Sequence, residues 1–509
     1  MAKIWRFPWH SLLFGIYPVL ALMAANLHEA PLEDGLRALF ISLVLAIVLL
    51  IILAQLLNNW RRAGVLIAIL LLSFFSYGQV YDGLKTLGDL GVSVARHRFL
   101  LPVWLILTVA ILWWAWKREP VPSSTKIALN VVAILLLIFP AFQIFSFIVR
   151  GWSTEAEPAA IDSGGSANVM PPAEAPDIYY IIADAYSRQD LLKTFYGFDN
   201  SGFLNELRGL GFFVADCSLS NYPKTRLSLT SSLNMDYLEN LGITANDQRD
   251  AFWRHIRNSA VRKTLVVHGY KIVSLETGFY WTEWPDADLY LSRNDTGLHL
   301  NGFEALLLQT TLLRAPFALL SGIDEGVPDT IEGGTLEEHY AITRYALDAL
   351  DDLAFVEGPK FVFAHLLIPH RPFVFAADGS FTTEPRSLAE SYNAHVTYLN
   401  RRLIESLATI INESDRPVII ILQGDHGGPG TQSTYDRMKI LNAYYMPEAE
   451  DRLYSSITPV NSFRIVFDTY FGTNFGLLED LSYYSTSDDF FDVTLIRDDN
   501  PACLNSQPS

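Results

Sequence analysis

PDIYYIIADAY, residues 176–186, contains a continuous apolar run, Ile178–Ala183, that leads directly into Asp184. An uninterrupted run of this length is typical of a strand that is buried on both faces, as in a parallel sheet covered by helices. Ligands of such sheets bind beyond the carboxyl ends of the strands. The stretch therefore predicts a parallel α/β domain and marks Asp184 as a candidate site residue.

The chain downstream of this strand alternates between helical and strand patterns. Such alternation is typical of βα units whose strands lie side by side with helices on both faces. We therefore expect an α/β sandwich with a mostly parallel sheet. The expected helices are 201–211, 339–355 and 391–411, and the expected strands are 212–216, 271–275, 360–368 and 418–423.

Polar residues follow two of the later strands. His370 lies just beyond strand 360–368, and Asp425-His426 stands between glycines directly after strand 418–423. Carboxylates and imidazoles are common ligands of divalent cations. Each residue taken alone can also cap a turn or lie at the surface.

A third candidate lies in NYPKTRLSLTSSLNM, residues 221–235, where a turn signal precedes an apolar helix that we expect to begin near Leu227. Thr225 stands at this helix start between Lys224 and Arg226. Threonine is a good N-cap residue. A helix N-terminus flanked by two cations is also suited to bind an anion. Both interpretations of Thr225 stay open.

The chain is 50% hydrophobic, and the excess of apolar residues lies in its first third. Its runs are long enough to span a bilayer, and the first, which contains Pro18, is close to the lower limit of about 17 residues. We expect a bundle of about five transmembrane helices within residues 1–150. The runs are Ser11–Leu27, Ala38–Leu57, Gly64–Val80, Phe99–Trp116 and Ile127–Val149.

The loops between these runs predict the orientation of the bundle. Lys and Arg gather at the N-terminus and in the loops after the second and fourth runs, whereas the first loop is acidic. The loop after the third run is mixed. The positive-inside rule then places the N-terminus in the cytoplasm and the C-terminal part outside it. Residues 151–176, rich in Pro, Ala, Ser and Gly, are expected to be a tether to an outer domain over 177–509.

Charge and cysteine content limit the possible functions. Residues 1–150 carry 12 Lys or Arg and 6 Asp or Glu, a net charge of +6, so the −18 of the whole chain leaves −24 for the remainder. A domain this acidic argues against nucleic acid as a partner. The only cysteines, Cys217 and Cys503, form no CxxC motif. They could pair if this part lies outside the cytoplasm.

Taken together, these residues resemble the alkaline phosphatase/sulfatase superfamily. The resemblance rests on Asp184 after a buried strand, Thr225 at a helix start, His370-x-Pro372-Phe373 and the glycine-flanked Asp425-His426. The apolar runs, the tether and an outer domain look like its membrane branch, which comprises lipoteichoic acid synthases, phosphoglycerol transferases and lipid A phosphoethanolamine transferases. The pattern covers the whole architecture and most of residues 177–445, but it does not specify a substrate.

The resemblance implies one divalent metal ion held by Asp184, Thr225, Asp425 and His426. Mn, Zn, Mg and Ca all remain candidates, since one imidazole with oxygen ligands suits several metals. It further implies that Thr225 attacks the phosphorus of a membrane lipid or a lipid-linked substrate. Water or an envelope glycan would then accept the phosphoryl group.

Further residues receive expected roles from the same resemblance. His370 would stabilise substrate oxygens or protonate a leaving group. Lys224 and Arg226 would neutralise phosphate charge, or else belong to a solvated face. His365 and His395 are weaker candidates for additional contacts.

Departures from the family pattern bear on the chemistry. Sulfatases carry a Cys or Ser in a C/S-x-P-x-R frame, whereas this chain has Thr225-Arg226-Leu227-Ser228. Phosphorus chemistry is therefore favoured, and a sulfatase-like hydrolase is the alternative enzyme. A non-catalytic protein that binds an envelope polymer is the alternative from another class, and a transporter is disfavoured because the spans lack paired charges. The apolar stretch Phe303–Leu320 is expected to be a buried core helix or a segment lying on the bilayer.

Overall fold

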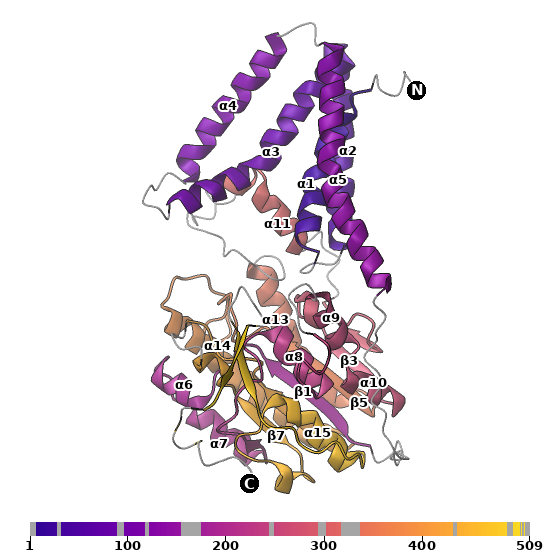
Figure 1. Ribbon diagram of the computed structural model, residues 1–509. Helices are drawn as coiled ribbons and strands as arrows, with labels where there is room; N and C mark the ends of the chain where they lie inside the picture. Colours follow the sequence, from indigo (N-terminus) through magenta and orange to yellow (C-terminus); the bar gives the residue numbers. More distant parts are fainter. Residues whose placement is uncertain are drawn as a thin grey trace. The chain divides into compact units, whose positions relative to one another are not determined.

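The computed structural model describes residues 7–27, 32–88, 96–117, 122–153, 175–243, 249–293, 302–316, 336–430, 435–485, 492–498, 500 and 503. The chain divides into two compact units, which are described separately (Figure 1). The first comprises Met1–Glu155 and Gly297–Thr335, and the second comprises Ala156–Thr296 and Leu336–Ser509.

The first unit contains the apolar helices that the sequence predicts. Helices α2 to α5 are long and apolar enough to cross a membrane, whereas α1 is shorter. Large apolar side chains such as Phe40 and Phe139 are exposed on these helices, as expected for surfaces that face lipid. The bounds are α1 Trp9–Ala25, α2 Asp34–Leu57, α3 Trp60–Gly88, α4 His97–Lys117 and α5 Ser123–Ser153.

A short helix from much later in the chain, α11 (Gly302–Thr310), packs against α2 and α3 in this unit (Figure 1). The buried Glu304 forms an ion pair with Arg37. Gly78 permits close approach, because a Cβ atom there would lie 2.1 Å from the Gln309 carbonyl oxygen. The described part of the apolar stretch 303–320 therefore joins the helical unit, and the rest of that stretch lies outside the described residues.

The second unit is built on a seven-stranded sheet with the order β2-β7-β6-β1-β5-β3-β4. Strand β1 pairs in parallel with β5 and β6, and β3 pairs in parallel with β5 and β4; β7 is antiparallel to both of its neighbours. The predicted mostly parallel sheet is confirmed. The bounds are β1 Asp177–Ala183, β2 Phe213–Val214, β3 Lys271–Leu275, β4 Leu289–Leu291, β5 Lys360–Leu366, β6 Val418–Gln423 and β7 Asn442–Tyr445.

Helices cover both faces of this sheet, because side chains alternate between the faces along each strand. Tyr180 of β1 packs in the core with α8, α10 and α15, whereas its neighbour Tyr179 packs in the core with α6, α7, α13 and α14. Both tyrosines are fully buried. The helices are α6 Gln189–Thr194, α7 Ser201–Gly209, α8 Thr225–Asn234, α9 Arg249–Arg257, α10 Ala260–Val267, α13 Leu336–Asp352, α14 Leu388–Glu413 and α15 Pro459–Tyr470.

Smaller elements complete the second unit. Strands β8 and β9 form a separate antiparallel pair near the C-terminus. These strands are Ser482–Ser485 and Val493–Ile496, and the short 3-10 helices are η3 Tyr280–Thr282, η4 Leu353–Phe355, η5 Asp436–Met438 and η6 Glu450–Arg452.

Candidate functional site

The register of the three central strands brings the predicted acidic residues to one edge of the sheet. Ala183, the last residue of β1, pairs with Leu366 of β5, and Ile182 pairs with Gln423 of β6. Asp184 follows β1 directly and Asp425 follows β6 after one glycine, so neighbouring parallel strands bring both carboxylates to the same place.

Four predicted residues meet around one nitrogen atom. The His426 Nε2 atom lies 3.4 Å from Thr225 Oγ1, 3.5 Å from Asp425 Oδ2 and 3.7 Å from Asp184 Oδ1. None of the four residues is more than 9% exposed. Segments far apart in the chain thus present three oxygen atoms and one imidazole nitrogen to a single small volume.

The start of helix α8 directs the Thr225 hydroxyl toward this volume. The helix begins at Thr225, two residues before the expected start near Leu227, because the Lys224 carbonyl already accepts hydrogen bonds from the Leu227 and Ser228 amides. Lys224 is the N-cap residue and makes no side-chain cap hydrogen bond. Thr225 is therefore the first helical residue rather than the cap, and its hydroxyl contacts His426.

Glycines on either side of Asp425-His426 permit the tight backbone at this point. A Cβ atom at Gly424 would lie 2.6 Å from the Tyr186 carbonyl oxygen, and one at Gly427 would lie 2.8 Å from that of Asp436. Real Cβ atoms do not approach other atoms this closely, so positions 424 and 427 require residues without a side chain.

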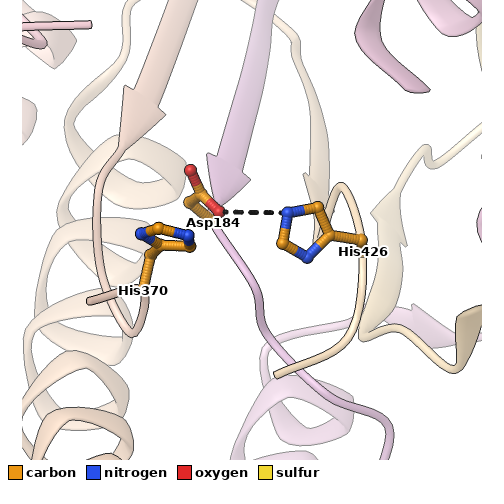
Figure 2. A group of neighbouring side chains, drawn as sticks. All are labelled: Asp184, His370 and His426. Carbon is orange, nitrogen blue, oxygen red and sulfur yellow. Dashed lines mark ion pairs between the residues drawn. The ribbon is translucent and has the colours of Figure 1, made fainter. Parts of the chain in front are cut away.

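Two further histidines border the cluster. His370 and His426 approach Asp184 from two sides (Figure 2), and these three residues have ligand atoms within 4.8 Å of one another. His365, given little weight from the sequence, lies on β5 with its Nε2 atom 3.2 Å from Asp184 Oδ2. Its Nδ1 atom is 2.8 Å from Thr282 Oγ1. The sequence signal was an imidazole near the carboxyl end of an otherwise apolar strand.

Other predicted residues lie around this centre. The Arg226 guanidinium lies over the Trp281 ring, 5.0 Å from its centroid. His395 lies on α14, where its Nε2 atom accepts a hydrogen bond from the Phe375 amide at 3.0 Å.

The cluster has the chemical character of a cation site. Asp184 Oδ1 and Asp425 Oδ2 are buried and have no hydrogen-bond partner among the described residues. Buried carboxylate oxygens without partners are costly unless a cation compensates them. Three oxygen donors and one imidazole fit several divalent metals. The residues present therefore fit a metal ion but do not select one.

The electrostatics keep the donors in the forms that metals bind. Burial disfavours the charged form of Asp184, but the neighbouring imidazoles of His370, His365 and His426 outweigh it and hold the Asp184 pKa below its ordinary value. Burial lowers the pKa of His426, against the opposing effect of Asp425. An ionised carboxylate and a neutral imidazole are the ligand forms.

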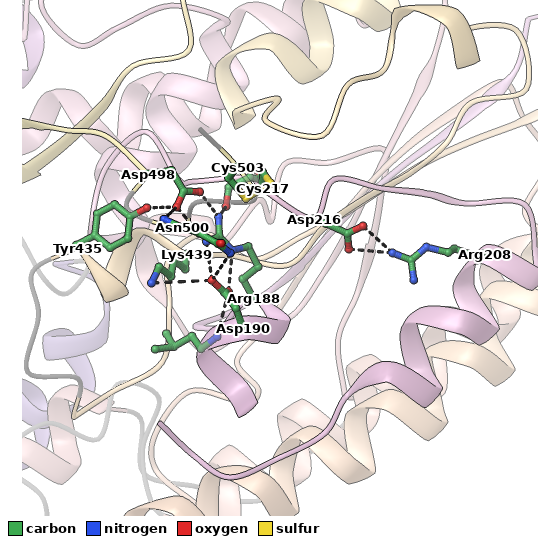
Figure 3. Close-up of a disulfide and its surroundings, with 12 residues drawn as sticks. Arg188, Asp190, Arg208, Asp216, Cys217, Tyr435, Lys439, Asp498, Asn500 and Cys503 are labelled. Carbon is green, nitrogen blue, oxygen red and sulfur yellow. Dashed lines mark hydrogen bonds and ion pairs between the residues drawn. A yellow bond between two sulfur atoms is a disulfide. The ribbon is translucent and has the colours of Figure 1, made fainter. Parts of the chain in front are cut away.

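A disulfide bond and a group of ion pairs connect residues near the C-terminus to earlier parts of the chain, including the segment that follows Asp184 (Figure 3). Cys217 and Cys503 form a disulfide bond. Close by, the buried Arg188 forms ion pairs with Asp190 at 2.8 Å and with Asp498 at 2.7 Å. A disulfide is expected in a domain outside the cytoplasm.

Comparison with known proteins adds similarity in fold. No protein-family model and no curated protein matches the chain. Among solved structures, the integral membrane lipooligosaccharide phosphoethanolamine transferase EptA from Neisseria meningitidis matches with a TM-score of 0.40 at 11% identity, covering 92% of this chain and 95% of that one.

Two periplasmic domains are also similar. That of EptC from Escherichia coli, in complex with Zn, has a TM-score of 0.38 at 11% identity and covers 62% of this chain and 91% of that one. That of the phosphoethanolamine transferase EptC from Campylobacter jejuni has a TM-score of 0.36 at 11% identity and covers 61% and 92%. Because these TM-scores lie below 0.5, the function has to be inferred from the side chains of this chain itself.

Proposed function

We propose that this chain is a membrane-anchored, metal-dependent phosphotransferase or phosphodiesterase with Thr225 as its nucleophile. The observation that carries the proposal is the meeting of Thr225 Oγ1, Asp184 Oδ1 and Asp425 Oδ2 within 3.4 to 3.7 Å of His426 Nε2. A threonine hydroxyl beside a cation-binding set is the arrangement that activates a weak alcohol nucleophile.

The proposed reaction consists of two displacements at phosphorus, with Thr225 as the first nucleophile. A divalent cation bound by Asp184, Thr225, Asp425 and His426 would supply the positive charge that lowers the pKa of the hydroxyl. The Thr225 hydroxyl gives its proton to solvent water as its oxygen forms a bond to phosphorus, and the bond from phosphorus to the leaving oxygen breaks. Water or an acceptor alcohol then attacks the phosphorus of this threonine phosphodiester, which still carries the second substituent of the substrate. The threonine oxygen leaves and regains a proton, which completes hydrolysis or transfer.

His370 is assigned to the leaving oxygen. It borders the cluster and is partly exposed, so it can exchange protons with solvent and still face the reacting group. Its imidazolium would give a proton to the departing oxygen and recover one from the incoming water or alcohol.

The proposed substrates are phosphodiesters of membrane lipids or of lipid-linked molecules, with an envelope glycan or water as acceptor. The Cys217–Cys503 disulfide supports a catalytic unit outside the cytoplasm. The helices among the described residues that are long and apolar enough to cross a membrane support a membrane anchor. The alternative enzyme class, a sulfatase-like hydrolase, is less well supported because residue 225 is threonine.

The test uses the full-length protein in detergent, reconstituted separately with Mn, Zn, Mg and Ca. Bis-p-nitrophenyl phosphate reports diester cleavage, labelled phosphatidylglycerol and phosphatidylethanolamine report diacylglycerol release, and p-nitrophenyl sulfate reports sulfatase activity. We expect diester turnover and, on intact-mass analysis, a phosphoryl adduct at Thr225. The variant Thr225→Ala should lose both, whereas Thr225→Ser should retain part of each.

Thr230→Ala is the matched control, because Thr230 lies on the same helix with its hydroxyl directed to the Phe252 carbonyl at 3.5 Å. This control should keep the wild-type rate. Turnover of the sulfate ester alone would favour the sulfatase-like alternative. Absence of all turnover with every metal would favour a binding protein.

A further inference from the structure

An arginine that the sequence did not single out faces the candidate site. Arg437 lies in η5 (Asp436–Met438), and its carbonyl accepts a hydrogen bond from the Gly427 amide at 2.6 Å. The backbone that carries Arg437 is thus attached directly to the loop that carries His426.

The Arg437 side chain has two contacts at the site. Its Nε atom donates to the Pro223 carbonyl at 2.8 Å, two residues before Thr225. Its Nη2 atom lies 3.4 Å from His426 Nε2, the atom around which the three oxygen donors gather. Arg437 forms no ion pair within 4.0 Å with any residue in the described parts of the chain. The Pro223 contact leaves most of the N–H donors of the guanidinium available.

The charges around His426 favour the binding of an anion beside Arg437. Asp184 and Asp425 contribute two negative charges, which one divalent cation would neutralise. Arg437 then adds a positive charge that no described carboxylate offsets. The site would then carry one net positive charge, and an anion with several oxygen atoms is the group that can contact both the cation and the guanidinium.

We infer that Arg437 binds the non-bridging oxygens of the phosphoryl group during transfer, and this inference rests on the proposed function. As the Thr225 oxygen attacks, negative charge is spread over these oxygens, and N–H donors already aimed at them stabilise that charge. A planar guanidinium presents two parallel donors to two oxygens, which an ammonium cannot do. A single metal ion and Arg437 together would then supply the positive charge for the reaction.

The competing explanation is that Arg437 only holds the Pro223–Thr225 segment in place. Loss of that role would disturb Thr225 and hence the metal set. Loss of phosphoryl binding would leave the metal set intact. Metal content and anion affinity therefore separate the two explanations.

The experiment uses the full-length, metal-loaded protein in detergent and inorganic phosphate as the probe. Phosphate affinity is measured by isothermal titration calorimetry, metal content by mass spectrometry, and diester turnover as above. For Arg437→Ala we expect phosphate binding at least tenfold weaker and kcat/KM lower by about two orders of magnitude, the typical loss on removing one transition-state donor. Metal content should stay at the wild-type level.

Two further variants keep the inference falsifiable. Arg437→Lys, which retains the charge but not the fork, should bind phosphate with intermediate affinity. Arg464→Ala is the matched control, because Arg464 also donates to backbone carbonyls, those of Gly476 and Met235. It should bind phosphate like the wild type.

Each outcome has a defined meaning. Wild-type phosphate affinity in Arg437→Ala, loss of metal in that variant, or no phosphate binding by the wild-type protein overturns the inference. Diester turnover that persists unchanged in Arg437→Ala overturns it while the proposed function stands. Arg437-dependent phosphate binding without any turnover supports the inference and removes the proposed function.

Discussion

A buried aspartate lies at each end of strand β1, and the two have contrasting surroundings: Asp177 is the first residue of the strand and Asp184 follows its last. At its amino end, Asp177 forms an ion pair with Lys360, and both side chains are 1% exposed. Asp177 also accepts a hydrogen bond from the Lys360 amide at 3.1 Å and lies 3.8 Å from Arg416 Nε. The negative charge at this end is compensated within the chain.

At the carboxyl end of β1, the charges are left incomplete. Asp184 Oδ1 and Asp425 Oδ2 have no hydrogen-bond partner among the described residues, although both residues are buried. The two ends of the same strand therefore differ. At one end the charged groups pair with each other, and at the other end two buried carboxylate oxygens have no hydrogen-bond partner among the described residues. A buried polar atom without a partner requires an explanation, and a bound ion is one such explanation.

The largest expected effect comes from breaking the compensated end. Lys360→Met leaves Asp177 buried with its main counter-ion removed, and we expect a loss of about 3–5 kcal/mol in the free energy of unfolding. Urea unfolding of the detergent-solubilised chain measures it. The double variant Asp177→Asn with Lys360→Met should recover much of the loss, and a double variant as unstable as the single one would contradict the assignment.

The uncompensated end should respond to a ligand instead. Adding the preferred divalent metal at 100 times its Kd should raise the free energy of unfolding of the wild-type chain by about 2.7 kcal/mol. Asp184→Asn should lose this increase, because it removes a proposed ligand charge. Asp177→Asn, at the other end of β1, should keep it. Equal stabilisation of Asp184→Asn and wild type would place the metal elsewhere.

A buried histidine extends the comparison to pH. Burial lowers the pKa of His395 from 6.5 to about 3, with the charge of His339 adding to the effect. Well above pH 6.5 the ring is neutral in both the folded and the unfolded chain, so the free energy of unfolding does not depend on this group. Between pH 6.5 and about 3, the ring binds a proton in the unfolded chain but not in the folded chain. The free energy of unfolding therefore falls by up to about 1.4 kcal/mol per pH unit as the pH decreases. His395→Gln should flatten this acid slope in unfolding curves, and an unchanged slope would assign it to other groups.

The smallest effect is expected at an exposed ion pair. Arg208 and Asp216 lie 2.8 Å apart, but their side chains are 42% and 56% exposed. Arg208→Ala should therefore change the free energy of unfolding by no more than about 1 kcal/mol. A loss comparable to that of Lys360→Met would show that burial does not decide the value of these pairs.

Much of the fold was predictable from local sequence. Continuous apolar runs such as Ile178–Ala183 indicated the central strands, and longer apolar runs indicated the N-terminal helices. The packing of α11 on α2 and α3 was not predictable, because an apolar segment carries no signal of which apolar surface it will cover. The helix start at Thr225 was missed by two residues, since Lys224 has no side-chain signal of an N-cap.

The candidate site was predictable in its members but not in its geometry. Asp184, Asp425 and His426 could be singled out because each follows a buried strand. The places of Arg437 and His365 beside the site could not be predicted. Arg437 follows a loop whose path the sequence does not specify. His365 lies inside a strand, where an imidazole is more often a packing residue.

Local sequence patterns were enough to predict the order of the helices and strands and the polar residues at their ends, because periodicity and burial are encoded within a few neighbouring residues. Tertiary packing was needed to bring Thr225, Asp184 and Asp425 to one nitrogen of His426, with Arg437 beside them. Such a meeting depends on strand register and loop path, which are set by packing between segments far apart in the chain.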